Sequence, residues 1–309
     1  IDNVTSRPSA AAATLLSAIQ WEPFGAVKSW QWRLASGANQ LHERSRDEWG
    51  RIVRYRLGNT IRDLTYDAGD RIVAYTHYDA VSAAGVPSLN QSFGYDELAR
   101  LSSITTATAN WGIGYDANGN RTSLTLNGLT GIYTTPSTSN RLTGTTNPTR
   151  GFGYDNAGNT LTTTTTSPTT ATYNAENRLA TMRVGSVTTT YAYDALGQRT
   201  RKFSSSGAAS TVIFVYDPQG RLLGEYNSAG TAVRELLWLD GEPVAVFTPN
   251  GTNPPNVFYV HNDHIQTPRV VTNPSGVLRW TWMAEPFGAT APNTNPAGQG
   301  AFTFNLRHP

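Results

Sequence analysis

Apolar and polar residues alternate over short stretches along most of this chain, and turn-forming residues separate the stretches. Residues 71–76, 121–126 and 221–226 show the pattern, and they are rich in β-branched and aromatic side chains. Alternation with a period of two is typical of half-buried strands, and short strands between tight turns are typical of hairpins. The pattern therefore predicts an all-β chain.

The turns repeat one motif, in which Tyr-Asp is followed by Gly or Asn and then by Arg. Its clearest copies contain Tyr66, Asp67, Gly69 and Arg71; Tyr115, Asp116, Gly119 and Arg121; Tyr193, Asp194, Gly197 and Arg199; and Tyr216, Asp217, Gly220 and Arg221. Weaker copies begin at Tyr95, at Tyr154 (with Asp155 and Gly158) and at Tyr173. The spacing of about 20 residues fits two strands and two turns. One such hairpin cannot bury its own apolar face, so we expect the tandem hairpins to form one continuous, curling antiparallel sheet.

Each residue of the motif has a physical reason to recur. The Asp carboxylate can accept hydrogen bonds from backbone N–H groups two residues on, and Gly or Asn supplies the positive φ of a tight turn. We expect the Arg to lie along a neighbouring Tyr ring. The motif thus predicts structural turn residues.

The chain divides into three segments of one structural unit. Residues 1–45 form a lead-in, residues 46–225 the hairpin array, and residues 226–309 a further β segment. Within the lead-in, residues 9–19 suit either a short helix or a strand. Glu-Pro-Phe-Gly occurs at 22–25 and 285–288, where we expect turns with Phe24 and Phe287 tucked inward.

Composition excludes several classes of function. Only 15% of the 309 residues are charged and the net charge is +2, so neither a nucleic acid nor an anionic membrane surface is an expected partner. The chain has no cysteine, which removes disulfides and thiolate chemistry. No apolar run is long enough for a membrane span. Because the chain begins at Ile1 without a signal-like segment, we expect it to be part of a longer protein.

His261, Asp263 and His264 are the one cluster with metal-ligand residue types. In an extended segment His261 and Asp263 share a face and His264 points away, and two ligands fall short of a stable site. We therefore expect a structural role, with hydrogen bonds to the turn at Thr267-Pro268, and keep metal binding or catalysis as the alternative. No nucleophile elbow, P-loop or dinucleotide motif occurs. We predict no cofactor and no enzymatic activity.

At this point the chain resembles the Rhs (rearrangement hot spot), or YD-repeat, proteins. The resemblance covers the Tyr-Asp turns, the segment 259–269, the turn 285–288 and the segment 302–309, which stops just before the family's Gly-Gln. Residues 217–220 look like the family's Asp-Pro-x-Gly cleavage stretch, but they fall in register with the repeat turns, so we assign no protease residues.

The resemblance implies a hollow β-cocoon shell around a toxic C-terminal domain. Such proteins are exported against competing cells, often by type VI secretion or within Tc toxins. The partners implied are the toxin domain of the same polypeptide, the remaining shell sequence and proteins of a secretion apparatus. Since the ends of a sheet fragment are unpaired, we also expect self-association through its edges. A secreted or cell-surface location follows.

Two other readings of the repeat remain open. Aromatic hairpins of this period also occur in modules that bind carbohydrate or cell wall, although those pair aromatic residues within each repeat. A β-propeller is the weaker alternative, because four-stranded blades would give a period near 40 residues.

Overall fold

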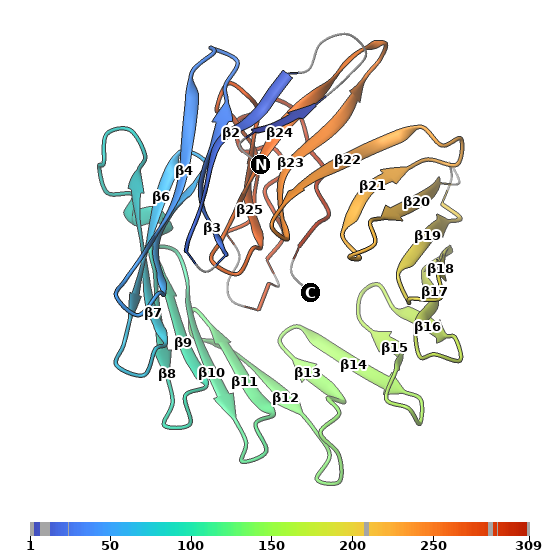
Figure 1. Ribbon diagram of the computed structural model, residues 1–309. Coiled ribbons are helices and arrows are strands. Elements are labelled where there is room, and N and C mark those ends of the chain that lie inside the picture. Colours follow the sequence, from blue (N-terminus) through green and yellow to red (C-terminus); the bar gives the residue numbers. More distant parts are fainter. Residues whose placement is uncertain are drawn as a thin grey trace. The chain divides into compact units, whose positions relative to one another are not determined.

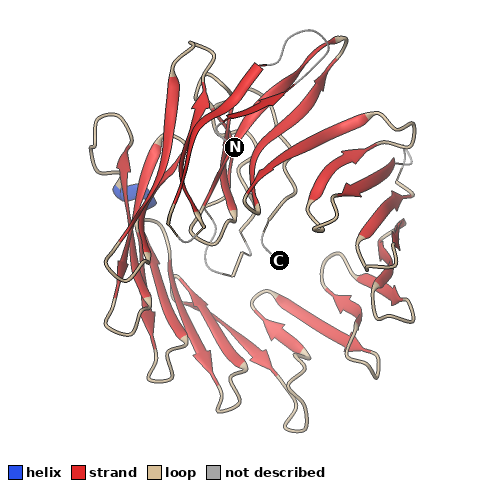
Figure 2. Cartoon of the chain, in the orientation of Figure 1, coloured by secondary structure: helices blue, strands red, loops and turns tan. Residues whose placement is uncertain are grey.

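The computed structural model describes residues 3–6, 13–23, 25–206, 210–283, 287–288 and 290–307 (Figure 1). Among these, strands dominate, and the short 3-10 helix η1 (Pro87–Leu89) is the helical element (Figure 2). The expected fold class is confirmed, since the strands are antiparallel and belong to one sheet whose order follows the chain. No helix in the described part of the chain is long and apolar enough to cross a membrane.

The chain forms two compact units. The terminal unit comprises residues 1–92 and 234–309, and the central unit comprises residues 93–233. This boundary lies inside the expected hairpin array, so the Tyr-Asp turns fall in both units. The three-segment division of the sequence stays a prediction.

The terminal unit contains two runs of strands. The first run is β1 (Asn3–Ser6), β2 (Ala13–Trp21), β3 (Val27–Arg33), β4 (Asn39–Arg46), β5 (Ile52–Leu57), β6 (Thr60–Tyr66), β7 (Ile72–Asp79) and β8 (Gln91–Tyr95), which reaches into the central unit. The second run is β22 (Ala232–Leu239), β23 (Glu242–Asn250), β24 (Asn253–Asn262), β25 (Pro268–Thr272) and β26 (Leu278–Thr281).

The central unit continues the same pattern of consecutive strands. Its strands are β9 (Leu101–Thr106), β10 (Asn110–Tyr115), β11 (Arg121–Leu126), β12 (Leu129–Thr134), β13 (Gly144–Thr146), β14 (Thr149–Tyr154), β15 (Thr160–Thr164), β16 (Thr169–Tyr173), β17 (Leu179–Val184), β18 (Val187–Tyr193), β19 (Arg199–Ser204), β20 (Ser210–Tyr216) and β21 (Leu222–Tyr226). They follow one another along a curved path (Figure 1).

The helix considered for residues 9–19 is wrong for its described part. Residues 13–21 form strand β2, which pairs with β3 in a register that places Leu16 opposite Trp32. Leu15, Leu16 and Ile19 are all buried, although an unbroken strand would turn Leu15 and Leu16 to opposite faces. The register shifts twice between Ser17 and Trp21, and Ala18 adopts a φ of 51°. Burial of these side chains outweighs the helix preference of Ala, because tertiary packing overrides intrinsic propensity.

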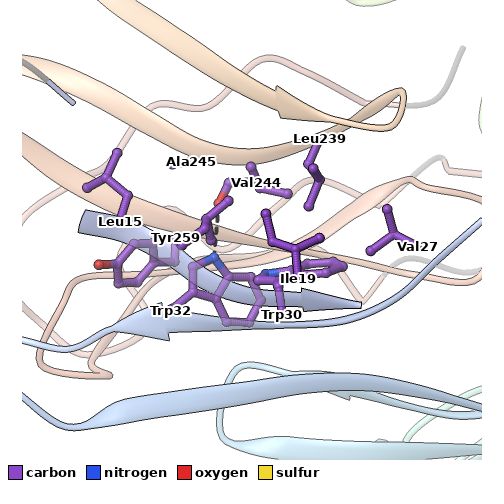
Figure 3. Close-up of a cluster of buried hydrophobic side chains, with 10 residues drawn as sticks. Leu15, Ile19, Val27, Trp30, Trp32, Leu239, Val244, Ala245 and Tyr259 are labelled. Atoms are coloured by element: carbon purple, nitrogen blue, oxygen red, sulfur yellow. Dashed lines mark hydrogen bonds between the residues drawn. The ribbon is translucent and has the colours of Figure 1, made fainter. Parts of the chain in front are cut away.

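The main core of the terminal unit lies between its two runs of strands (Figure 3). Trp30 and Trp32 from β3 are fully buried, and they pack against Val244 and Ala245 from β23. The Trp32 indole Nε1 donates a hydrogen bond to the Val244 carbonyl oxygen at 3.3 Å. The first and last parts of the chain are therefore joined by one core.

The central unit has much less core. Its buried hydrophobic side chains, within the residues described, are Ile104, Ile113 and Phe214. Most other side chains on both faces are partly exposed. Strand β15, with its run of Thr, is paired on both sides, by β14 and β16, and such pairing suits a polar strand whose own register is weak. The unit is a single sheet layer.

The expected inward position of Phe287 is wrong, because its side chain is 50% exposed. Phe24 and residues 285–286 lie outside the described residues. The turn at 22–26 is closed by hydrogen bonds from the Glu22 N–H to the Ala26 carbonyl and from the Gly25 N–H to the Glu22 carbonyl. Its backbone therefore reverses as the motif predicts.

Candidate functional site

The Tyr-Asp turns share one backbone geometry, which the turn at Asp116 illustrates. The Asp116 N–H donates to the Asn120 carbonyl at 2.9 Å, and the Gly119 N–H donates to the Asp116 carbonyl at 3.1 Å. The Asp116 Oδ1 accepts the N–H groups of Asn118 at 2.9 Å and Asn120 at 2.8 Å. The register of β10 against β11 shifts between Gly114 and Tyr115, so a β-bulge adjoins the turn. This is the three-residue hairpin loop with a bulge, held by an aspartate.

The third residue after Asp takes the left-handed conformation in every one of these turns. In four of the predicted copies it is a glycine: Gly119 (φ 84°), Gly158 (φ 93°), Gly197 (φ 84°) and Gly220 (φ 82°). In the first copy the prediction for Gly69 is wrong, because Asp70 occupies this position with a φ of 61°. Gly69 lies one residue earlier, where its N–H donates to the Asp67 carboxylate at 2.9 Å.

In the turns headed by Asp67, Asp116, Asp155 and Asp217, the fourth residue after Asp binds the second carboxylate oxygen. Arg71 Nε donates to Asp67 Oδ2 at 2.7 Å, and Arg221 Nε donates to Asp217 Oδ2 at 2.6 Å. The equivalence expected for Arg121 and Arg199 is wrong. Asn120 and Gln198 fill the fourth position, while Arg121 and Arg199 come fifth and begin the next strands. Arg71 and Arg121 look equivalent by residue type, but the position counted from Asp sets the role. Arg121 stands one position further from its Asp than Arg71 does.

The Tyr hydroxyls connect each repeat to the one before it. Each donates to the carbonyl oxygen of a residue at or within two positions of the start of the strand after the preceding turn: Tyr66 to Ile52 (2.9 Å), Tyr115 to Leu101 (2.8 Å), Tyr154 to Leu142 (2.7 Å), Tyr173 to Thr160 (3.1 Å), Tyr193 to Leu179 (2.8 Å) and Tyr216 to Arg199 (3.0 Å). Successive repeats are thus linked in one direction along the chain.

Arg side chains link the repeats in the opposite direction, by lying over the Tyr ring of the next turn. The guanidinium carbon of Arg51 lies 4.4 Å from the centre of the Tyr66 ring, and that of Arg100 lies 4.6 Å from the Tyr115 ring. The expected stacking of Arg on Tyr is therefore found between repeats, with the Arg of one turn over the Tyr of the next. Such contacts contribute about 0.5–1 kcal/mol each at exposed sites.

The turn aspartates are structural acceptors. The hydrogen bond from the Arg71 side chain, then the one from the Arg71 N–H, lowers the pKa of Asp67 below its ordinary value. The hydrogen bond from the Asn120 side chain similarly lowers the pKa of Asp116. Carboxylates that stay ionised and saturated with hydrogen bonds are poor general acids.

His261, Asp263 and His264 do not converge on one point. Asp263 heads another turn of the same kind, with Oδ1 accepting the Thr267 N–H at 3.0 Å and Oδ2 accepting from Arg269 Nε at 2.7 Å. His261 is buried with Nε2 at 3.1 Å from Thr272 Oγ1, and His264 Nδ1 lies 3.5 Å from the Tyr55 hydroxyl. Within the described ranges, no group of three His, Cys, Asp or Glu could hold a metal ion.

Sequence reasoning missed Asp263 as a turn residue. The sequence motif gave no signal here, because Gln266 stands where the motif has Gly or Asn, yet Gln266 adopts a φ of 63°. The hydrogen bond expected between this segment and Thr267 is present for Asp263. His261 instead lies against Thr272 on the neighbouring strand.

A buried ion pair in the terminal unit was also missed. Arg44 on β4 donates through Nη1 to Glu242 Oε1 at 2.7 Å and through Nη2 to Oε2 at 2.5 Å. Asn262 Nδ2 donates to the same carboxylate at 3.1 Å. The two charged residues are 198 positions apart, and no local pattern predicts their pairing.

Tandem antiparallel hairpins whose Tyr-Asp turns interlock from repeat to repeat define a YD-repeat shell protein. The sequence profile of the Teneurin YD-shell family matches residues 81–305. This chain therefore belongs to the Teneurin YD-shell family, and the YD-repeat resemblance is confirmed.

Solved structures share the fold. A TcdB2-TccC3-Cdc42 structure is 15% identical over 86% of this chain and 16% of the matched chain, with a TM-score of 0.54. A Tc holotoxin pore from Photorhabdus luminescens with a mutated TccC3 is 14% identical over 96% of this chain and 18% of the matched one, also with a TM-score of 0.54. This chain thus spans less than a fifth of either matched chain. A comparison with curated proteins gave no match.

Proposed function

We propose that this chain is a section of the wall of a shell that encloses a toxic domain at the C-terminal end of the same polypeptide. Membership of the YD-shell family and the fold shared with chains of Tc toxin structures support the proposal. The observation that carries it is the link between repeats, in which Tyr hydroxyls bond the preceding repeat and Arg side chains such as Arg51 and Arg100 cover the Tyr of the next turn. Such a link extends a sheet repeat by repeat without a separate core.

The composition of the central unit suits a wall. Its strands carry many Thr, Ser and Gly, and hydroxyl pairs such as Thr163–Thr169 (2.7 Å) bridge neighbouring strands. A sheet whose side chains stay partly exposed on both faces can separate solvent from an enclosed polypeptide. The role proposed is therefore structural, and the chain itself performs no catalysis.

The proposed shell has partners within its own polypeptide and outside it. The toxic domain and further shell sequence belong to the same polypeptide, and proteins of a secretion apparatus, such as type VI, deliver the shell to competing cells. The assembled protein is accordingly secreted or displayed at the cell surface.

Electron microscopy of a longer polypeptide tests the shell. The sample carries this chain together with the adjoining shell sequence and the C-terminal domain. We expect a hollow particle with density inside it, and a C-terminal domain that resists protease until the shell is unfolded. A solid particle, or a C-terminal domain digested as fast as the free domain, would overturn the proposal.

The edges of the sheet predict how the 309-residue chain behaves alone. In the described part of the chain, β1 pairs with β2 and presents its other edge unpaired. Unpaired edges recruit other strands. We expect concentration-dependent association in light scattering, and a monodisperse monomer would contradict this expectation.

A further inference from the structure

Arg178 in the central unit lacks the carboxylate that its counterparts have. Arg71, Arg100 and Arg221 each pair with the aspartate that heads their own turn. The turn of Arg178 is headed by Asn174, whose Oδ1 still accepts the N–H groups of Glu176 at 3.1 Å and Arg178 at 2.8 Å. Asparagine keeps the turn but offers a neutral amide where the second carboxylate oxygen would be.

The guanidinium of Arg178 finds no substitute acceptor. It lies 5.9 Å from the centre of the Tyr193 ring and passes over Gly197, where a Cβ atom would collide with it. Among the described residues, no hydrogen bond or ion pair satisfies this guanidinium. Arg141 also lacks a carboxylate, but it donates to the carbonyl oxygens of Asp155 and Asn156, both at 3.1 Å.

A pocket of about 450 Å³ lies beside Arg178, between the turns headed by Asn174 and Asp194. Tyr191 and Tyr193 line it from β18, and the small side chain of Ala180 leaves room on β17. The Asp194 carboxylate in its wall already accepts the N–H groups of Leu196 and Gln198, both at 2.9 Å. The exposed Glu176 adds a second carboxylate to the lining.

We propose that this pocket binds a ligand carboxylate on Arg178, in the place that an aspartate fills in the other turns. The planar guanidinium presents paired N–H donors that match a carboxylate. The Tyr rings give the ligand an apolar wall, and Glu176 accepts hydrogen bonds from its hydroxyl or ammonium groups. A sugar acid and an amino acid both present this chemistry. The site is independent of the shell role.

Titration of the 309-residue chain followed by NMR tests the pocket. The probes are glucuronate, glutamate, acetate and, as an uncharged comparison, glucose. We expect weak, saturable binding of the carboxylates, with shifts around residues 174–195, and none of glucose. Tightest binding of glucuronate assigns the site to a sugar acid. Tightest binding of glutamate assigns it to an amino acid.

Asn174→Asp is the decisive variant, because it places a carboxylate on Arg178 within the chain. We expect affinity to fall at least about tenfold, with an unchanged or raised melting temperature. Asn227→Asp is the matched control, since it makes the same change in a turn whose fourth residue is Thr231. Its affinity should equal that of the unmodified chain, and Arg178→Gln should bind as weakly as Asn174→Asp.

Two results would overturn the proposal. One is the absence of carboxylate-dependent shifts in the unmodified chain. The other is equal affinity of Asn174→Asp and Asn227→Asp. Neither result bears on the enclosure of a toxic domain, which is measured on the longer polypeptide.

Discussion

Tyrosine hydroxyls bond backward to the preceding repeat, and one of them can be removed without changing the packing of its ring. Tyr115→Phe deletes the 2.8 Å hydrogen bond to the Leu101 carbonyl. We expect a loss of about 0.5–1.5 kcal/mol in the free energy of unfolding, measured by urea denaturation. Tyr133→Phe is the control, because the Tyr133 hydroxyl makes no hydrogen bond to the described residues. Equal losses in both variants would show that the bond adds nothing.

The left-handed turn residue can be tested equally cleanly. Gly119 has a φ of 84° and nothing within 4 Å of an added Cβ, so Gly119→Ala isolates the backbone cost. That cost should be about 1–2 kcal/mol. Gly112 has no left-handed φ, and its Cβ would meet Thr125 at an ordinary 3.7 Å. If Gly112→Ala lowers the urea midpoint as much as Gly119→Ala, turn conformation is not the cause.

Strands β4 and β23 are joined by charges buried on both sides. The Arg44 and Glu242 side chains are 6% and 1% exposed. Glu242→Gln leaves the guanidinium buried without its anion, and we expect the free energy of unfolding to fall by about 3–5 kcal/mol.

A second, more exposed ion pair in the same unit tests whether burial sets the cost of removing the carboxylate. Arg54, 52% exposed, pairs with Asp63 at 2.6 Å across β5 and β6. Asp63→Asn should cost less than about 1 kcal/mol. Similar thermal destabilisation by Asp63→Asn and Glu242→Gln would mean that burial is not what makes the Arg44 pair strong.

The two units of the chain are stabilised differently. The central unit relies on ladders, turn carboxylates and links between repeats, whereas the terminal unit adds the core around Trp30 and Trp32. Local opening measured by hydrogen exchange should therefore be easier in β13 to β16 than in β3 and β23.

The whole chain should lose stability in mild acid because of buried histidines. Burial, and then the charge of Arg62, lowers the pKa of His77 from 6.5 to about 3; burial and Arg56 do the same for His261. His77 Nε2 also accepts a hydrogen bond from Arg62 Nε at 2.8 Å, which protonation would remove. Both residues are therefore neutral in the folded chain.

The sign follows from proton uptake on unfolding. Between pH 6.5 and 3 the unfolded chain binds more protons, so stability is full above pH 6.5 and falls as the pH drops. Each histidine should cost about 2 kcal/mol at pH 5. The turn aspartates add their loss only below their ordinary pKa of 3.8. Urea midpoints at pH 7.5 and 5 measure the effect, and His77→Gln or His261→Gln should reduce it; an unaltered pH dependence in both variants would refute this assignment.

The all-β fold, the period and the Tyr-Asp turns were determined by the sequence alone, because a turn is closed by hydrogen bonds among residues at most four positions apart. The family could be predicted for the same reason, because its Tyr-Asp motif lies within a few consecutive residues. Two turn details were missed: Asp70 rather than Gly69 takes the positive φ, and Asn120 rather than Arg121 binds the second carboxylate oxygen. In both cases the position counted from Asp, and not the residue type, sets the role.

Tertiary structure alone decided the contacts between distant parts of the chain. Strand rather than helix at residues 13–21, Trp32 against Val244, and Arg44 with Glu242 all depend on which strands lie opposite each other. The lack of a carboxylate partner for Arg178 likewise suggests a binding site only because a pocket lies beside this side chain. These contacts bury side chains that are some 200 positions apart, so no short stretch of sequence predicts them. The hydrogen bonds of each turn, in contrast, lie within five consecutive residues.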